Sequence, residues 1–439
     1  MNVPPTIPAQ ALVCLVLLLD CIASASRAEV ISTPLEVAYV GPRFGERTVP
    51  PPTTPAAPEP DPAEWCGASP WREWSRLTGD WGTSRPKLEG LGLTFDGSYI
   101  LDASSMLGGG LRQRALARGL LDLNLTFDPK PLLGIEGGTF FIQYHSLHGP
   151  NGSADAGSLQ AFSNIDGDAY DDLGEVWYEQ KFLHDRLRVK LGQVDANAEF
   201  AFATAAHEFI NASAGFTPAL VGFATYPKPA LSLNLFAYPT DWLYAGAGAY
   251  TDNHQDLSGA SFERPYLLGE IGFTHKGTRR LGPGRLAVGC WQETEELDQF
   301  DGGRRDGTTG LYCVAEQQVW KEHPENRDDV QGISIFGQYG WADAQISAIE
   351  HQVGVGLTAV GLVPGRDEDT LGVYCTTALT SRVSGAGFQR DETCVECFYS
   401  LHLARFFSLK PDLQWIAHPG GHASPETAWV ATLRVTTAF

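Results

Sequence analysis

The last eleven residues of the chain, WVATLRVTTAF at positions 429–439, decide the fold. Every second residue from Trp429 to Phe439 is largely apolar, whereas the set between them is more polar and includes Arg434. A period of two is typical of a β-strand with one apolar and one polar face. The sequence therefore predicts a strand here, and the fold depends on what each of its faces meets.

The same alternation recurs from about residue 93 onward, in stretches separated by Gly, Asp, Asn and Pro. LLDLNLTFD at 120–128, TFFIQYH at 139–145 and DRLRVKLGQ at 185–193 each divide into an apolar and a polar face. In a soluble β-sandwich the apolar face meets a core, whereas in a transmembrane barrel it meets lipid and the polar face lines a wet lumen. The region contains no helix of core-forming length, and its polar face carries full charges of both signs. Both features favour the barrel.

We therefore predict an all-β fold, a transmembrane antiparallel up-and-down β-barrel of about 16 strands within a range of 14 to 18. The barrel is expected over residues 71–439, with a short helical segment within 71–92. A bacterial outer-membrane barrel characteristically ends on a strand with a terminal aromatic residue, which pairs with the first strand. Phe439 fits that role.

The composition agrees with a strand-rich protein. The 439 residues include 48 Gly, 22 Phe, 14 Tyr and 11 Trp but 2 Met, and aromatic residues favour strands. The formal net charge of −21 argues against a nucleic-acid partner, because phosphate repels such a surface. We find no nucleophile elbow, phosphate-binding loop or HExxH motif, so we expect no cofactor, no metal site and no catalytic residues.

The N-terminal region is predicted to act in export. The apolar run ALVCLVLLL at 11–19 has the length of a signal-peptide core, and small residues follow it. We expect residues 1–28 to be a signal peptide. Residues 29–70 form a proline-rich extension, expected to be disordered, because the run PPPTTPAAPEPDP at 50–62 cannot pack a core.

Six cysteines follow the signal peptide, and their spacing gives no clear metal motif. Cys394 and Cys397 would face opposite sides of a strand, so they should not bond to each other. Cys290 and Cys313 lie on either side of the turn-like stretch 300–307. The sequence leaves open whether these two cysteines form a cross-strand disulfide or remain unbonded thiols.

The stretch IDGDAYDD at 165–172 is rich in aspartate but departs from the EF-hand spacing. We expect a solvated acidic loop, with a calcium site as the alternative.

Four segments resemble the carbohydrate-selective porins of the OprB type. LTGDWGTSRPKLEGLGLTFDGSY at 77–99 is similar to the segment that precedes the first strand in that family, and RGLLDLNLTFD at 118–128 to an early strand. GQVDANAEFA at 192–201, followed by HEFINAS at 207–213, and KPDLQWIAHPGG at 410–421 resemble later family segments in the same order. The resemblance covers roughly residues 71–439.

The chain departs from the family pattern at three of these positions. Thr83 stands where Gly is usual, Gln193 where Lys is usual and Trp415 where Tyr is usual. Gln193 removes a positive charge from a position expected in the lumen or at its rim, which affects selectivity. The resemblance implies a 16-stranded outer-membrane porin that passes sugars, often monosaccharides, by facilitated diffusion.

Residues of two kinds would select a sugar: aromatic faces that stack on a pyranose, and charged or amide groups that bond to adjacent hydroxyls. Such residues cluster in the hairpin expected between 173–180 and 185–193, where pairing would bring Trp177 and Glu179 close to Arg188 and Lys190. Most lumenal charges merely keep a channel wet, so direct contact with sugar is expected for a minority. The pore-lining candidates are Arg118, Asp122, Glu175, Trp177, Glu179, Arg188, Lys190, Asp195, Asn197 and Glu199.

The sequence thus predicts an outer-membrane channel for carbohydrates, with small sugars and membrane lipid as its partners. A less selective general-diffusion porin, or a channel for another small solute, is the first alternative. A barrel enzyme and a secreted β-sandwich binding protein are the others. The sequence leaves open a homotrimer and a contact between the proline-rich extension and the cell wall.

Overall fold

The structure, a computed structural model, describes residues 70–251, 261–278, 281–325 and 330–439. The predicted signal peptide and nearly all of the proline-rich extension, with Cys66, lie outside these residues. Among the described residues, no helix has the length and apolar character needed to cross a membrane.

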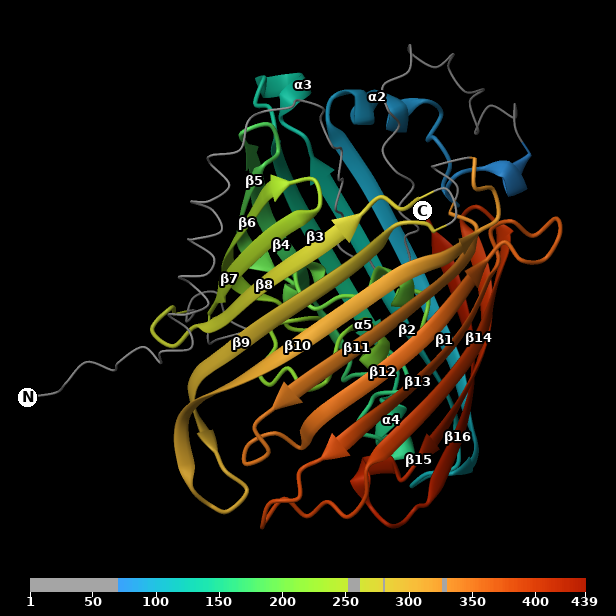
Figure 1. The fold of residues 1–439 in the computed structure, drawn as a ribbon. Coiled ribbons are helices and arrows are strands. Elements are labelled where there is room, and N and C mark those ends of the chain that lie inside the picture. The colour runs from blue at the N-terminus through green and yellow to red at the C-terminus, as the bar shows by residue number, and fades with distance from the viewer. Residues whose placement is uncertain (1–69, 252–260, 279–280, 326–329) are drawn as a thin grey trace, which may run out of the picture.

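Sixteen strands of the described chain form one closed barrel in which every neighbouring pair is antiparallel (Figure 1). The fold and the strand number predicted from the alternation are therefore confirmed. The strands are β1 (Leu93–Gly109), β2 (Ala115–Phe127), β3 (Gly138–His148), β4 (Tyr170–Phe182), β5 (Leu187–Val194), β6 (Ala230–Thr240), β7 (Leu243–Tyr250), β8 (Tyr266–His275), β9 (Gly284–Asp298), β10 (Arg304–Lys321), β11 (Gly332–Ala342), β12 (Ile349–Val360), β13 (Thr370–Thr380), β14 (Glu392–Ala404), β15 (Phe407–Ala417) and β16 (Thr427–Ala438).

The helices are short. They are η2 (Trp71–Glu73), α2 (Ser84–Gly90), α3 (Lys130–Leu133), α4 (Ser153–Ala156), η3 (Ala196–Ala198), η4 (Thr204–Ala206), α5 (Ala212–Gly215) and η5 (Pro419–Gly421). The helical segment expected within 71–92 is present as η2 and α2. Thr83, which precedes α2, has a φ of 74°. This left-handed conformation favours glycine, the residue usual at that position in the family that the sequence resembles.

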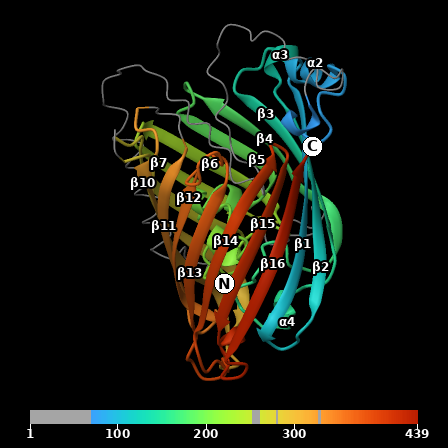
Figure 2. The ribbon, with the colours of Figure 1, turned by 90° about the vertical axis from the view of Figure 1, so that its right-hand side faces the viewer.

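The barrel closes where the chain ends. β16 pairs with β1 from Ser98 opposite Ala438 to Gly109 opposite Ala428, and the two strands lie side by side in Figure 2. Phe439 extends the pairing, since its N–H donates to the Gly97 carbonyl and its own carbonyl accepts from the Gly97 N–H. A closed sheet leaves no unpaired strand edge to face hydrocarbon, and the terminal strand has the role predicted for it.

The two faces of the wall differ as the alternation predicted. On β2, Leu123 is exposed on the outside while Asp122 and Asn124 are buried on the inside. On β14, Cys394 is buried inside and Cys397 is exposed. Cys290 and Cys313 do not form a disulfide with each other. The register explains this, because Cys290 lies opposite Leu311 and Cys313 opposite Val288, so the two thiols are diagonal rather than facing partners.

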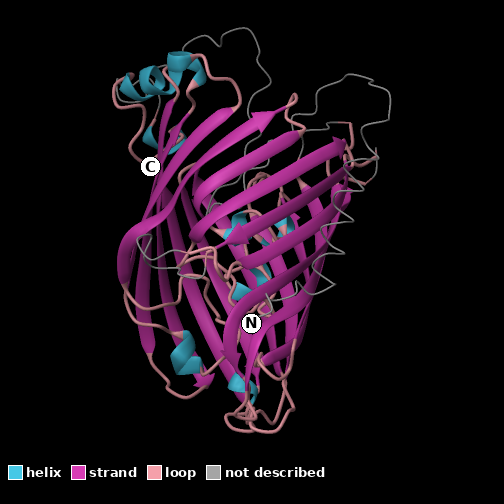
Figure 3. Ribbon diagram, turned by 90° about the vertical axis from the view of Figure 1, so that its left-hand side faces the viewer, coloured by secondary structure: helices cyan, strands magenta, loops and turns pink. Residues whose placement is uncertain are grey.

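The core of the molecule lies inside the barrel. Two connections turn inward: residues 149–169 between β3 and β4, which we call the first inward segment, and residues 195–229 between β5 and β6, the second inward segment. Figure 3 shows short helices of these segments within the ring of strands. Phe200 and Phe209 of the second segment pack against inward aromatic side chains of the wall, including Tyr312, Tyr374 and Phe398.

Inward aromatic side chains of the wall lie over glycines on neighbouring strands. Phe336 on β11 is directly opposite Gly356 on β12, and Phe398 on β14 is opposite Gly372 on β13. A Cβ atom at Gly356 would come within 2.3 Å of the Phe336 ring, and one at Gly372 within 2.2 Å of the Phe398 ring. Aromatic residues that cover glycines fix strand register in curved sheets.

We expect Gly356→Val to destabilise the barrel by about 1–3 kcal/mol, because the new side chain overlaps the Phe336 ring. The free energy of unfolding is measured by titrating the refolded protein with urea. The folded fraction is monitored through its heat-modifiable electrophoretic mobility. Gly108→Val is the control, since a Cβ there meets nothing within 4 Å. Equal stability of the two variants would refute the packing role of the glycine.

Candidate functional site

The predicted hairpin is present and forms one side of the site. β4 pairs with β5 so that Glu179 lies opposite Lys190 and Trp177 lies opposite Gly192. The chain then leaves the wall after Val194 and enters the barrel as the second inward segment, which carries Glu199 back to the hairpin. Glu199 accepts from Arg188 at 2.5 Å and from Lys190 at 2.6 Å.

Two cations and two carboxylates therefore form one buried cluster. Arg188 also pairs with Glu179 at 2.9 Å, and Lys190 approaches the same carboxylate at 3.4 Å. Burial alone would raise the pKa of Glu199, but the charges of Arg188 and Lys190 outweigh it and lower that pKa to about 2. The cluster thus holds balanced charge and fixes the start of the second inward segment to the wall.

Trp177 is half-buried, and its ring contacts residues of the wall. Its ring stacks on Phe141 with centroids 4.9 Å apart, and the Lys190 ammonium lies 3.8 Å from its centroid. Its indole N–H donates to Glu175 at 3.1 Å. The position suits a cation–π contact that orients Lys190.

Asp195 and Asn197 hold the turn by which the chain leaves the wall. The Asp195 carboxylate caps η3 by accepting the Asn197 N–H at 2.7 Å, and it also accepts from the Thr225 hydroxyl at 2.7 Å. The Asp195 N–H donates to Glu175 at 3.1 Å, and the Asn197 side chain donates to the Phe200 carbonyl. Both side chains bond within the segment itself.

Arg118 and Asp122 belong to a different part of the inner wall. Arg118 pairs with Asp166 of the first inward segment at 2.7 Å and lies 3.6 Å from Asp102, whereas Asp122 accepts from Gln143. Asp166 lies in the acidic stretch considered for calcium, and it accepts from the backbone N–H groups at 152 and 153 as well. In the part of the chain that the structure describes, no group of three His, Cys, Asp or Glu side chains is placed to hold a metal ion.

Gln193 does not face this charged cluster. Its amide donates to the carbonyls of Leu173 and Gly174 on β4, at 3.0 Å and 2.9 Å. Glutamine in place of the usual lysine at position 193 therefore removes a positive charge beside the backbone carbonyls of Leu173 and Gly174 on β4.

Sequence reasoning missed a second set of charged contacts with the inward segment. Lys410 on β15 pairs with Glu208 at 2.5 Å. Glu316 on β10 accepts the Ala205 N–H at 2.9 Å and pairs with Arg285 on β9, also at 2.9 Å. Burial opposes ionisation of Glu208, but Lys410 and His207 hold its pKa well below the usual range. Lys410, Arg285 and Glu316 lie at inward positions of strands whose residues alternate between apolar and polar. No short sequence motif links them to residues 195–229.

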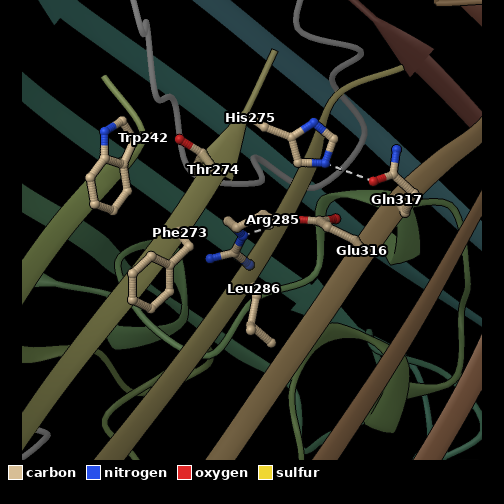
Figure 4. Close-up of a pocket in the computed structure, with 8 residues that line it drawn as sticks. All are labelled: Trp242, Phe273, Thr274, His275, Arg285, Leu286, Glu316 and Gln317. Carbon is tan, nitrogen blue, oxygen red and sulfur yellow. Dashed lines mark hydrogen bonds and ion pairs between the residues drawn. The ribbon is translucent and has the colours of Figure 1, made fainter. Parts of the chain in front are cut away.

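A recess of 390 Å³ lies at the barrel end that carries the short β6–β7 and β8–β9 turns (Figure 4). Trp242 and Phe273 stack there with centroids 6.1 Å apart, and His275 bonds to Gln317 across 2.8 Å. Both Trp242 and Phe273 are exposed large hydrophobic residues. The recess therefore combines an aromatic edge of the wall with the Arg285–Glu316 ion pair.

Comparison with known proteins identifies the family. The model of the carbohydrate-selective porin, OprB family, matches residues 112–439. This chain belongs to that family. Porin B of Pseudomonas aeruginosa is 24% identical over 426 residues, which covers 84% of this chain and 92% of Porin B. A putative porin, QuiX, of Acinetobacter baylyi is 22% identical, with coverage of 84% and 93%.

The porin fold is shared with a solved structure. The high-pH structure of Pseudomonas putida OprB superposes with a TM-score of 0.75 and 22% identity, covering 84% of this chain and 99% of that one. Family membership and the closed barrel make the chain a carbohydrate porin of the outer membrane. The family describes a transport channel, in agreement with the first function predicted from the sequence.

Removing Glu199 should change the ion preference of this porin. Glu199→Gln leaves Arg188 and Lys190 with Glu179 as their remaining carboxylate. We expect the ratio of anion to cation permeability to rise roughly threefold in single-channel recordings across a KCl gradient. Glu350→Gln removes an equal charge from a partly exposed residue of β12 and is the matched control. An unchanged ratio in Glu199→Gln would contradict the role of the cluster.

The same cluster predicts a pH dependence. The pKa of Glu199 is lowered from 4.5 to about 2, so its ion pairs contribute their full stability above about pH 4.5 and lose it as the pH falls toward 2. Single-channel conductance should thus stay steady down to about pH 3 in the wild type and become noisier as the pH approaches 2, where Glu199 of the folded channel is protonated. Glu199→Gln should show no such change in that window, and equal noise in both proteins would exclude Glu199 as its source.

Proposed function

We propose that this porin passes small neutral sugars, monosaccharides above all, by passive diffusion through a lumen narrowed by its two inward segments. The observation that carries the proposal is that the cations around the second inward segment are each paired with a carboxylate. Arg188 and Lys190 share Glu179 and Glu199, while Lys410 pairs with Glu208 and Arg285 with Glu316. An anion channel instead needs cations left free to attract its solute.

Paired charges suit a sugar for a further reason. Carboxylates and cations fixed against each other still offer acceptors and donors to adjacent hydroxyls, replacing the water that a sugar loses. Binding must stay weak if the solute is to leave. Thr204 and His207 are exposed side chains of the inward segment, and we propose that they contact the sugar beside the Glu208–Lys410 pair.

The residues predicted from the sequence fit this proposal in two ways. Glu179, Arg188, Lys190 and Glu199 would set the charge beside the path from their buried positions. Arg118, Asp122, Glu175, Trp177, Asp195 and Asn197 would support it, because their contacts hold the wall and the inward segments.

We also propose that residues 1–28 direct export and are removed, and that residues 29–70 extend from the end of the barrel that carries α2. The apolar run at 11–19 and the prolines at 50–62 support this division. By the general rule that porin turns are short on the periplasmic side, this end faces the periplasm.

Reconstitution into liposomes tests the function. Osmotic swelling should be faster with glucose or another monosaccharide than with amino acids of equal size, because the paired charges favour neutral polyols. Heat-modifiable mobility confirms correct insertion. Equal rates for all solutes of one size would leave a general-diffusion porin, and no swelling with inserted protein would overturn the proposal.

A further inference from the structure

The two inward segments are held at a part of the wall far from where they leave it. The second segment starts at β5, and in the closed ring β14 lies nine strands from β5 in one direction and seven in the other. Both segments nevertheless bond to β14 and β15. The segments therefore span the lumen, and their far attachment decides how wide a passage remains.

The attachment on β14 consists of two carboxylates that bind backbone amides. Glu396 accepts the N–H of Ile210 at 2.7 Å and that of Asn211 at 3.0 Å. Glu392, four residues earlier and on the same face, accepts the N–H of Leu159 at 2.8 Å and that of Gln160 at 2.7 Å. Glu392 accepts a third N–H, from Gly420 of the β15–β16 connection, at 2.8 Å.

A cross-strand neighbour joins the two attachments. Gln414 on β15 lies directly opposite Glu396. Its carbonyl oxygen accepts from the Asn211 side chain at 3.1 Å, and its amide donates to the Phe162 carbonyl at 2.7 Å. Glu392, Glu396 and Gln414 are all fully buried. One small area of wall thus binds the first and the second inward segment together.

We propose that Glu392 and Glu396 are positioning residues that fix the width of the sugar path, each by binding two adjacent backbone N–H groups of an inward segment. The inference rests on the proposed function of the same channel. A carboxylate suits the task because its two oxygens accept both N–H groups at once. Irregular backbone buried in a barrel otherwise has no partner for these donors.

The second inward segment keeps other attachments when one carboxylate is lost. Glu270 accepts the Ala201 N–H at 3.1 Å, Glu316 accepts the Ala205 N–H at 2.9 Å, and Lys410 donates to the Glu208 carbonyl at 2.6 Å. Loss of Glu396 should therefore free residues near 208–213 without releasing the whole segment. Those residues directly follow His207, one of the two side chains proposed to meet the sugar.

Glu396→Gln provides the sharpest test. The glutamine offers one acceptor and turns an NH₂ group toward a backbone N–H, so one of the two bonds becomes a contact between donors. We expect single-channel conductance to rise by roughly half or more. The swelling rate with a trisaccharide, relative to that with a monosaccharide, should rise severalfold. Glu392→Gln should act in the same direction through the first segment.

Controls separate positioning from stability. Glu350→Gln changes a carboxylate outside the inward segments and should leave both values unchanged. A residue that served folding alone would lower the number of channels inserted but not the conductance of each channel. If Glu396→Gln does not fold, Gln414→Ala removes the neighbouring bonds and keeps the carboxylate, and a smaller rise in the same two values is expected.

The outcomes also separate this proposal from the function itself. The positioning role would be overturned if folded Glu396→Gln kept the wild-type conductance and the wild-type ratio of trisaccharide to monosaccharide swelling rates. If only Gln414→Ala folds, the same result in that variant would overturn the role. Failure of the wild type to prefer sugars over equally small amino acids would instead overturn the proposed sugar selectivity. A wider channel in Glu396→Gln would support positioning in either case, since conductance is measured with KCl.

Discussion

Every buried backbone N–H and C=O needs a hydrogen-bond partner, and this requirement shapes both the wall and the interior of the porin. Toward lipid it demands a sheet without edges, which β16 provides by pairing with β1 and by the bonds of Phe439 to Gly97. Inside, the irregular segments cannot pair as strands. Their donors are satisfied by wall carboxylates such as Glu270 and Glu396 instead.

These carboxylates explain why the channel is acidic without being an open cation site. A lumen lined by free glutamates would attract cations strongly and bind sugars unevenly. Here Glu396 and Glu392 are occupied by backbone amides, and Glu199 is occupied by Arg188 and Lys190. Much of the acidic side-chain capacity inside the barrel thus serves to hold the segments.

The alternation of apolar and polar residues was enough to predict the barrel, because the two faces of each strand can be read from that strand's own sequence. The β4–β5 hairpin could be predicted too, since its partners are close in sequence and its turn is short. The partners of the inward segments could not. Lys410 and Glu208 are 202 residues apart, and nothing in either neighbourhood indicates which wall position an irregular segment will reach.

The same limit explains the candidates that the sequence placed less well. Trp177 was expected to offer a stacking face, but alternation fixes the side of a strand and not what covers the ring, here Phe141 and Lys190. Asp195 and Asn197 continue the apparent period of β5, yet the strand ends at Val194 and η3 begins. A periodic pattern cannot show that the chain has left the sheet.

Packing and hydrogen bonding together hold the second inward segment against the wall. Its apolar residues, among them Phe200 and Phe209, press on the aromatic wall that lies over the glycines of neighbouring strands. Its backbone donors are bound by carboxylates at several points around the ring. Hydrophobic contact is not directional, so it would allow the segment to slide, whereas paired amide bonds fix its register. A weakly bound sugar can be selected by shape only if the passage keeps one shape, and the carboxylates supply that constraint.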